Sequence, residues 1–581
     1  MIKHFINKYI PISVWLMSYQ KQWLKHDILA GLVVGIVLIP QGMAYALIAG
    51  IPPIYGLYTA LVPPLIYAIF GSARQISPGP VAMDSLLVLT GVSVIAELGT
   101  DYYLEVVFIL TALVGLIQFA LGFFRLGFLV NFLSKPVISG FTSAAALVIG
   151  LNQVKHLFGL NLPNSSSIYV LFTELFNSIK NLDVYTTIIG LGSVGIILLM
   201  KKYIAKFPSA LIVVVGGILL IHFFPNLFKS VKIVGAIPAG LPDFHIPVWD
   251  WELVKKLLPA GFTLAMLGFL ELIAIAKSQE STQEDYQVRS NQEFVALGFV
   301  NMVSSMFSGY VLASSFSRSA INFENGAKTP LSNIVSSLFM GIVLLFLTSL
   351  FFELPIAVLA SIIIVAVFNL VKYKEAIRLW RGSKRDFWMW VITFVFTSTM
   401  GIVEGVSVGV IVSLLVLLAR STNPHYAILG RISGTNYFRN ISRFEGVEIN
   451  PEILIMRFDS ELYFANTNFF NEHLDKQAHK KGKQLKLVIL DFESVNGMDS
   501  SSADALKQRI KYYDSRHVKM YFTNVKGPVR DTMTRFGIIA DLGNDHFFMS
   551  IAGAVDYFET GEKGIKDDLL PYINQANQYK V

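Results

Sequence analysis

The stretch from Leu29 to Ala73 contains no charged residue, and this places the strongest limit on what the chain can fold into. A helix needs about 20 mainly apolar residues to cross a bilayer, so this stretch alone has room for two crossings. Of the 581 residues, 54% are hydrophobic and only 15% are charged, whereas soluble domains carry about 25% charged residues. Because lipid offers the backbone no hydrogen bonds, the apolar segments must be helical. The sequence therefore predicts a polytopic α-helical membrane protein.

The apolar pattern predicts fourteen membrane segments, seven on either side of the long connection 224–254. The third segment of each set is too short to cross a bilayer, so we predict a half-helix at both places. Two such sets with an odd number of segments predict an inverted repeat. The segments are 27–48, 54–70, 80–96, 104–123, 136–154, 185–201, 207–224, 255–276, 292–309, 315–326, 331–352, 354–371, 386–402 and 404–420.

The two predicted half-helices begin in similar ways. Ser77-Pro-Gly-Pro-Val-Ala-Met-Asp-Ser85 opens the first, and Ser314-Ser-Phe-Ser-Arg-Ser319 opens the second. A helix that begins at membrane depth leaves backbone N–H groups unpaired, and its N-terminus carries about half a positive charge. Paired broken segments in corresponding halves point to the substrate site of a transporter. We therefore predict that the two helix ends face each other and hold a small anionic substrate.

The chain becomes rich in charged residues after Arg420, which predicts a soluble domain behind the membrane domain. Residues 453–458, 485–492 and 519–523 are predicted as strands, and 502–513 as a helix. This alternation predicts a small α/β domain with a partly parallel sheet. The predicted division is an N-terminal segment 1–26, a transport domain 27–421 with repeats 27–224 and 255–421, a soluble domain 440–560 and a tail 561–581.

The distribution of lysine and arginine predicts the orientation in the membrane. With the N-terminus in the cytoplasm, the inner loops carry far more of these residues than the outer loops. Fourteen segments return the C-terminus to the cytoplasm. The basic residues lie between spans rather than in one stripe, so the net charge of +7 indicates orientation, and no nucleic-acid partner is predicted. No cleavable signal peptide is evident, and the absence of cysteine excludes disulfides and thiol catalysis.

Five motifs resemble, in order and spacing, those of the sulfate permease (SulP) family of anion transporters. They are Pro40-Gln-Gly-Met-Ala-Tyr-Ala46, Pro53-Ile-Tyr-Gly-Leu-Tyr-Thr-Ala60 with Phe70-Gly-Ser-Ala-Arg74, Asn291-Gln-Glu-Phe-Val-Ala-Leu-Gly298, Ser315-Phe-Ser-Arg-Ser-Ala-Ile-Asn322 and Gly326-Ala-Lys-Thr329. The tail resembles the family's STAS domain, with Asp499-Ser-Ser-Ser502 at its signature turn. The resemblance covers nearly the whole chain, and Ala73 stands where a serine is usual. It implies a seven-plus-seven inverted repeat with core and gate domains, a homodimer and a bacterial inner membrane.

The resemblance also places Gln41 in the lining of the substrate pocket, where Pro40 frees a backbone carbonyl. Some proton-coupled relatives carry a glutamate at this position, and a glutamine cannot titrate. A glutamine that bridges two helices is the alternative. Tyr45 lies one turn on and could line the pocket, although packing is the commoner role of such a residue. Val81 and Ala82 are small enough to let the backbone N–H groups of the first half-helix reach an anion.

Arg318 is the most informative residue of the second half-helix. A guanidinium at membrane depth costs about 3 kcal/mol or more unless it is paired or hydrated, so we expect it to attract the anion. Pairing with lipid phosphate is the alternative. Ser315, Phe316 and Ser317 would surround the same anion, the serines through hydroxyl or backbone N–H groups, and helix capping is the alternative for both serines.

Two carboxylates in apolar segments are candidates for coupling. Glu271 lies within an apolar span, and the resemblance implies that an acidic residue at this position binds the cation in sodium-coupled relatives. It could also carry a proton or form a structural ion pair. Asp84 lies in the first turn of the first half-helix, where the dipole stabilises an acid. We favour a capping role for Asp84 over a proton site.

Ser500 is a regulatory candidate only through the resemblance, because related anti-sigma antagonists are phosphorylated at the serine after this aspartate. A turn that caps the following helix is the preferred interpretation of Asp499-Ser-Ser-Ser502.

The predicted function is secondary transport of a small anion such as sulfate, bicarbonate or a dicarboxylate, with sodium or a proton as the co-transported ion and no cofactor. Anion exchange without a cation, nucleobase transport and a membrane-anchored STAS sensor remain as alternatives. An enzyme is not predicted, because no nucleotide loop, catalytic triad or metal-ligand cluster stands out.

Overall fold

The computed structural model describes residues 10–128, 134–162, 165, 167–203, 209–280, 287–368 and 370–561. The chain divides into two compact units, residues 1–413 and 414–581, and each is described by itself.

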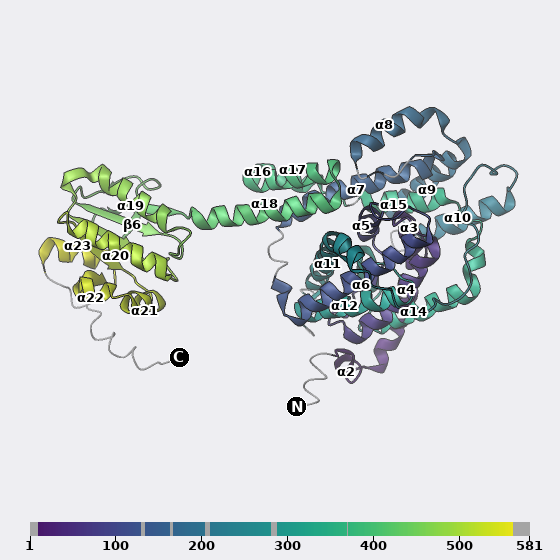
Figure 1. Ribbon diagram of the computed structural model, residues 1–581, viewed down its shortest axis with the longest axis horizontal. Coiled ribbons are helices and arrows are strands. Elements are labelled where there is room, and N and C mark those ends of the chain that lie inside the picture. Colours follow the sequence, from purple (N-terminus) through teal and green to yellow (C-terminus); the bar gives the residue numbers. More distant parts are fainter. Residues whose placement is uncertain are drawn as a thin grey trace. The chain divides into compact units, whose positions relative to one another are not determined.

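The first unit is helical apart from a small two-stranded ribbon (Figure 1). Within the described residues, a helix lies in each of the fourteen predicted segments. These helices are α3 (Leu24–Ile48), α4 (Pro53–Phe70), α5 (Ala82–Val92), α6 (Asp101–Phe123), α7 (Lys135–Phe158), α9 (Val184–Tyr203), α10 (Ser209–Phe223), α11 (Trp251–Glu280), α12 (Ser290–Met306), α13 (Phe316–Glu324), α14 (Leu331–Ile342), α15 (Ile356–Phe368), α17 (Lys384–Thr399) and α18 (Ile402–Thr422). The unit also contains α2 (Ile12–Trp15), α8 (Ile168–Ser178) and α16 (Tyr373–Gly382), which the apolar pattern did not predict.

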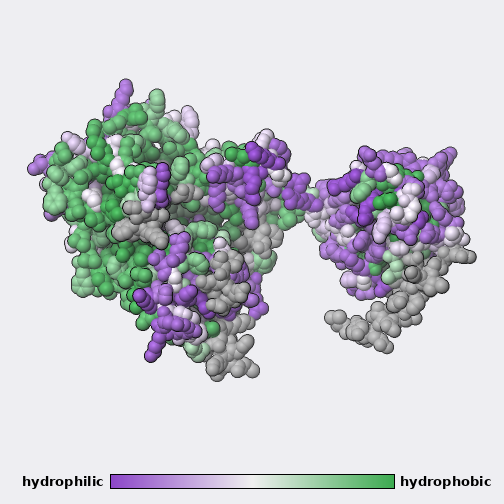
Figure 2. Space-filling model, turned by 180° about the vertical axis from the view of Figure 1, so that it is seen from behind, coloured by the Kyte–Doolittle hydropathy of each residue, from purple (hydrophilic) through white to green (hydrophobic). Residues whose placement is uncertain are grey.

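Length and composition separate these helices into two kinds. Among the described residues, nine helices are long and apolar enough to cross a membrane. The predicted half-helices are much shorter, with eleven residues in α5 and nine in α13. The face of this unit seen in Figure 2 is largely apolar. Helix α9 is one example, because its side chains Ile188, Leu191, Leu198 and Leu199 are exposed. Such side chains fit contact with lipid, so this is a membrane protein; the inverted repeat itself stays a prediction.

The helices of the first unit pack in two groups. In one group, α6 packs on α11 and α12, and α14 packs on α3 and α4; in the other, α7 packs on α9, α15 and α17. Glycine allows a close approach in the first group, between α6 and α12. A Cβ on Gly115 would lie 2.6 Å from the backbone nitrogen of Met302, so only a residue without a side chain fits there.

Two buried carboxylates tie the halves of the first group together. Asp27, at the start of α3, accepts hydrogen bonds from the backbone N–H and the hydroxyl of Thr329. Glu293, at the start of α12, accepts hydrogen bonds from the Tyr67 hydroxyl and the Ser72 backbone N–H. Each carboxylate thus holds a loop from the opposite half, which gives a structural reason for the motifs around Ser72 and Thr329.

The second unit is an α/β domain whose sheet has the strand order β4-β3-β6-β7-β8-β9, with β5 paired to β3. The strands are β3 (Tyr426–Ile432), β4 (Phe438–Asn440), β5 (Val447–Glu448), β6 (Ile453–Phe458), β7 (Leu487–Asp491), β8 (Lys519–Thr523) and β9 (Phe547–Phe548). β6 to β9 are parallel neighbours, whereas β3 runs antiparallel to β6. The partly parallel sheet was predicted, but β3 lies before residue 440, where the sequence placed the start of this domain.

Alternation along the strands builds a core on each face of this sheet. Leu454, Val488 and Met520 face one core together with α19 (Thr467–Lys481), α20 (Ser500–Asp514) and α21 (Gly527–Arg535). Ile455 and Ile489 face the other, together with α23 (Ile551–Thr560). The short α22 (Ile538–Leu542) completes the helices of this unit. Neighbouring residues of a strand point to opposite faces, so a sheet covered on both sides reads as a continuous apolar run.

Candidate functional site

The two half-helices meet through the strands that precede them. β1 (Pro78–Gly79) leads into α5, and β2 (Ala313–Ser314) leads into α13. They pair antiparallel, with Pro78 opposite Ser314 and Gly79 opposite Ala313. The hydroxyl of Ser319 accepts a hydrogen bond of 3.0 Å from the backbone N–H of Ser77 and fixes this pairing. The structure therefore brings together the two stretches that the sequence singled out.

Arg318 lies at the centre of this junction and is fully buried. Its Nη1 donates hydrogen bonds to Oε1 of Gln41, at 3.1 Å, and to the backbone oxygen of Pro80, at 2.8 Å. Its Nε and Nη2 have no hydrogen-bond partner among the described residues. A buried guanidinium with two unpartnered nitrogens is unusual, because buried polar groups normally have partners. Two donors of this side chain are thus available to a ligand.

Gly79 makes room for the guanidinium. A Cβ at this position would lie 3.2 Å from Nη2 of Arg318 and 3.2 Å from a methyl carbon of Leu38. The backbone of Gly79 has a φ of +155°, which residues with a side chain rarely adopt. The sequence marked the Pro-Gly-Pro run as a break in the chain but did not predict this contact.

Gln41 links α3 to α13 through Arg318, so the bridging role that the sequence left open is present. Tyr45, one turn further along α3, is buried and lies within electrostatic reach of Arg318. Tyr310 was not predicted as a site residue. It is fully buried, and its phenolic hydroxyl lies 3.0 Å from the hydroxyl of Ser85 in α5 and within electrostatic reach of Arg318. Its position just before β2 was the signal that could have identified it.

Asp84 is also fully buried, and neither of its carboxylate oxygens has a hydrogen-bond partner among the described residues. The capping role that we favoured for Asp84 is therefore wrong. The N-cap residue of α5 is Val81, which has no side chain able to cap. The physical reason is that Asp84, although it lies in the first turn of α5, is buried with neither oxygen hydrogen-bonded to the free N–H groups of that helix.

Glu271 in α11 resembles Asp84 in its surroundings. Its Oε2 is buried without a hydrogen-bond partner. The charges that bear on it are those of Asp84, Arg318 and Lys372. One other carboxylate and two cations thus act on Glu271 from other segments of the chain. A buried carboxylate is costly as an anion unless a cation or proton offsets its charge.

The remaining predicted residues lie around the helix ends. Val81 is half-buried and Ala82 is buried at the start of α5. Ser315 is the N-cap residue of α13, but its hydroxyl lies 3.2 Å from that of Ser317 and does not cap the helix. Phe316 is 55% exposed, so it lies on a surface rather than inside the packed junction.

In the second unit, Asp499 caps α20. Its carboxylate accepts hydrogen bonds of 2.8 Å from the backbone N–H groups of Ser502 and Phe464. The preferred capping interpretation of this turn is confirmed, and Ser500 is exposed beside it.

The geometry of the first unit suits binding of an anion rather than metal chemistry. Two helix N-termini and the Nε and Nη2 of Arg318 offer positive potential and hydrogen-bond donors at one place. Within the described part of the chain, no group of three or more histidine, cysteine, aspartate or glutamate side chains could hold a metal ion.

Comparison with known proteins agrees with this geometry. Residues 24–393 match the Sulfate permease family, and residues 446–554 match the STAS domain. The chain is 38% identical over 568 residues to "Sulfate transporter 4.1, chloroplastic" of Arabidopsis thaliana, covering 95% of this chain and 82% of the relative. It is 33% identical over 574 residues to "Sulfate transporter 1.2" of the same plant, covering 95% of this chain and 88% of that relative.

Solved structures show the same fold. The murine Solute Carrier 26 family member A9 anion transporter in the inward-facing state superposes with a TM-score of 0.88 at 29% identity, covering 96% of this chain and 95% of that chain. The transmembrane domain of the cyanobacterium bicarbonate transporter BicA has a TM-score of 0.59 at 24% identity, covering 68% and 98% of the two chains. The second likeness supports the fold of the membrane unit alone.

Proposed function

This chain belongs to the sulfate permease family of anion transporters, and we propose that it holds its anion between the N-terminal ends of α5 and α13. The observation that carries this proposal is Arg318, which is buried beside both helix ends with Nε and Nη2 unpartnered. The anion or its path would be surrounded by residues at the two helix ends, namely Val81, Ala82, Ser315 and the surface-exposed Phe316 and Ser317. Gln41 and Tyr45 would hold the guanidinium in position.

We further propose that the substrate is a small oxyanion of the sulfate type. The curated relatives that match over most of their length are named sulfate transporters. A planar guanidinium and backbone N–H groups suit the several acceptor oxygens of such an ion. Bicarbonate and dicarboxylates share this chemistry and belong in the same substrate panel.

Coupling to a sodium ion or a proton through Glu271 is part of the proposal. Moving an anion inward against the membrane potential costs about 2.3 kcal/mol per charge per 100 mV, so a concentrative importer must bring cations. Asp84, Glu271 and a divalent anion would together outweigh the charges of Arg318 and Lys372. A cation on Glu271 would reduce this excess of negative charge.

The transport cycle that we propose is alternating access. The helix group around α3, α6, α12 and α14 would act as the core domain, and the group around α7, α9, α15 and α17 as the gate domain. We also propose a homodimer in a bacterial inner membrane, with both termini and the STAS domain in the cytoplasm.

The test is uptake of labelled sulfate into liposomes that contain the purified full chain. Arg318→Ala should weaken sulfate binding about 100-fold, because truncating one partner of a buried charged contact costs about 3 kcal/mol. Arg381→Ala removes an exposed arginine of α16 and is the matched control. Wild-type uptake by Arg318→Ala would exclude this site, and uptake of uracil in place of anions would favour the nucleobase alternative.

A further inference from the structure

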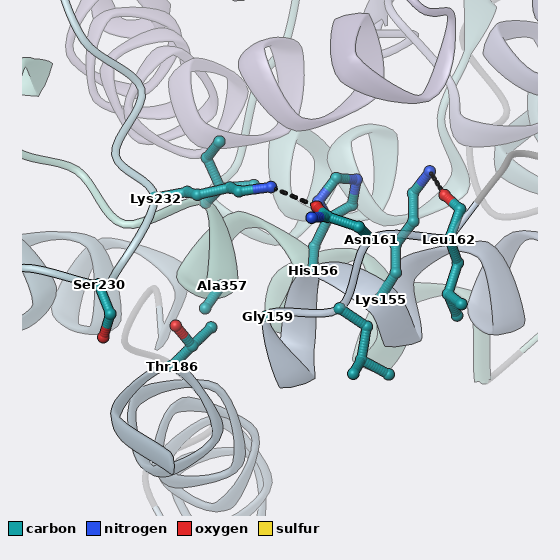
Figure 3. Close-up of a pocket in the computed structure, with 11 residues that line it drawn as sticks. Lys155, His156, Gly159, Asn161, Leu162, Thr186, Ser230, Lys232 and Ala357 are labelled. Atoms are coloured by element: carbon teal, nitrogen blue, oxygen red, sulfur yellow. Dashed lines mark hydrogen bonds between the residues drawn. The ribbon is translucent and has the colours of Figure 1, made fainter. Parts of the chain in front are cut away.

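A second group of basic residues surrounds a cavity of about 170 Å³ in the first unit (Figure 3). The cavity lies where the end of α7, the beginnings of α9 and α15, and the segment 230–232 come together. Its lining residues are Lys155, His156, Gly159, Leu160, Asn161, Leu162, Thr186, Ser230, Lys232, Ile356 and Ala357. None of them belongs to α3, α5, α11 or α13, so this cavity is separate from the proposed transport site.

The charged side chains of the lining are all basic. Lys155 and Lys232 lie within electrostatic reach of each other, so their charges repel. Nζ of Lys232 reaches across the cavity to Oδ1 of Asn161 at 2.8 Å, beside the His156 ring (Figure 3). Nζ of Lys155 donates a hydrogen bond of 2.9 Å to the backbone oxygen of Leu162. Both lysines thus donate to neutral oxygens. Neutral oxygens do not cancel the repulsion between the two ammonium groups, and a bound anion would reduce it.

One carboxylate lies beside the cavity, and it is already engaged. Asp183 accepts hydrogen bonds from the backbone N–H and hydroxyl of Thr186 and from the Ser230 hydroxyl. Burial would raise the pKa of Asp183, but these hydrogen bonds outweigh burial and lower it. Its carboxylate oxygens are thus engaged by neutral donors at the start of α9 and on the segment 230–232.

Helix geometry adds to the positive potential. Ile356 and Ala357 are the first two residues of α15, a helix of thirteen residues, so its N-terminal end borders the cavity. A helix N-terminus favours an anion, and the two lysines around the same space strengthen this preference. A water molecule takes about 30 Å³, so the cavity has room for a small oxyanion and a few waters.

We propose that this cavity is a second anion site, which binds a small oxyanion such as sulfate or phosphate from the aqueous phase. In the proposed orientation, every lining segment belongs to the outer end of the membrane unit. A site there binds the anion independently of Arg318 and raises its concentration at the outer surface.

The experiment is equilibrium binding of labelled sulfate to the purified full chain in maltoside detergent. Two sulfates should bind per chain. Lys232→Gln and Lys155→Gln should both weaken the same one of the two binding events. The affinity should fall about tenfold or more, as expected for the loss of a charged hydrogen-bond donor. Lys229→Gln removes an exposed lysine of the same segment that does not line the cavity, and it should leave both events unchanged.

The variants also separate this inference from the proposed function. Arg318→Ala should remove the other binding event and leave the one that depends on Lys232. If Arg318→Ala removes all sulfate binding, or if Lys232→Gln and Lys155→Gln change neither event, the second site is refuted while the transport site stands. Affinity should be equal in phospholipid nanodiscs. Loss of the Lys232-dependent event there would identify a lipid phosphate as the occupant and overturn a soluble ligand.

Discussion

Nη1 of Arg318 donates a hydrogen bond of 3.1 Å to Oε1 of Gln41, although the two residues are 277 positions apart in the chain. The contact joins α3 to α13 and orients the guanidinium with a neutral acceptor. The backbone oxygen of Pro80 is a second neutral acceptor. Neither hydrogen bond therefore offsets the charge of Arg318, whereas a carboxylate at position 41 would partly cancel it.

Gln41→Glu tests this relationship directly. The new carboxylate should pair with Arg318 and compete with the substrate, so sulfate uptake should fall at least tenfold at neutral pH. Protonation of the glutamate at lower pH makes it neutral, and uptake should recover as the pH falls. Uptake by liposomes between pH 5 and 8 measures this profile. A variant with wild-type uptake at every pH would show that the Gln41–Arg318 contact does not control the anion site.

Gly79→Ala tests the space around the guanidinium. The added Cβ would lie 3.2 Å from Nη2 of Arg318 and would strain a backbone with a φ of +155°. We expect weaker sulfate binding with a similar yield of folded protein. Gly99→Ala is the control, because Gly99 also has a positive φ but nothing lies within 4 Å of its added Cβ. Equal losses in both variants would attribute the effect to backbone strain alone.

Glu271→Gln tests the proposed coupling. Gradient-driven accumulation of sulfate should be lost, while exchange of sulfate across the membrane continues, because the glutamine needs no cation to offset its charge. Asp84→Asn should have a milder effect. Uptake driven in turn by sodium and proton gradients provides the measurement. Accumulation by Glu271→Gln with an unchanged dependence on both gradients would point to an exchanger or to coupling through Asp84.

Cysteine labelling tests the orientation, and the native chain has no cysteine to give a background. A cysteine that replaces Lys229 should react with an impermeant maleimide added outside intact cells. A cysteine that replaces Lys202, at the end of α9, should react only after permeabilisation. The reverse pattern would overturn the predicted orientation and move the Lys155–Lys232 cavity to the inner side. Both Lys202 and Lys229 are exposed, so a cysteine at either position is accessible to the reagent on its own side of the membrane.

Asp499→Ala tests the cap of α20. Burial would raise the pKa of Asp499, but hydrogen bonds from the backbone N–H groups of Ser502 and Phe464 lower it overall. A lowered pKa means that the carboxylate stabilises the fold above about pH 4, the unfolded value, and that this contribution disappears as the pH falls further. The variant should lose about 1 kcal/mol at pH 7 and differ little from wild type in strong acid.

Hydrogen exchange of the Phe464 and Ser502 amides reports this loss locally. Asp504→Ala removes an exposed acid of the same helix and serves as the control. Equal protection in Asp499→Ala and wild type at pH 7 would contradict the capping role.

The sequence by itself determined the membrane class, the places of the fourteen helices and three strands of the soluble domain, β6, β7 and β8. These features follow from local patterns, because the length of an apolar run sets a membrane helix and proline or glycine interrupts it. The breaks before Ala82 and Phe316 are examples. The short amphipathic helices α8 and α16 were missed, because their apolar residues form no run long enough to cross a bilayer.

Only the tertiary structure decided which residues meet. Asp84 looks like a capping acid in the sequence, yet its oxygens have no hydrogen-bond partner among the residues that the structure describes. Gly79 touches Arg318, and Lys155 lies in one cavity with Ala357, through packing of segments far apart in the chain. Such contacts depend on how whole helices pack and on which hydrogen-bond donors this packing brings close to a given side chain. A local pattern of residues contains no information about either.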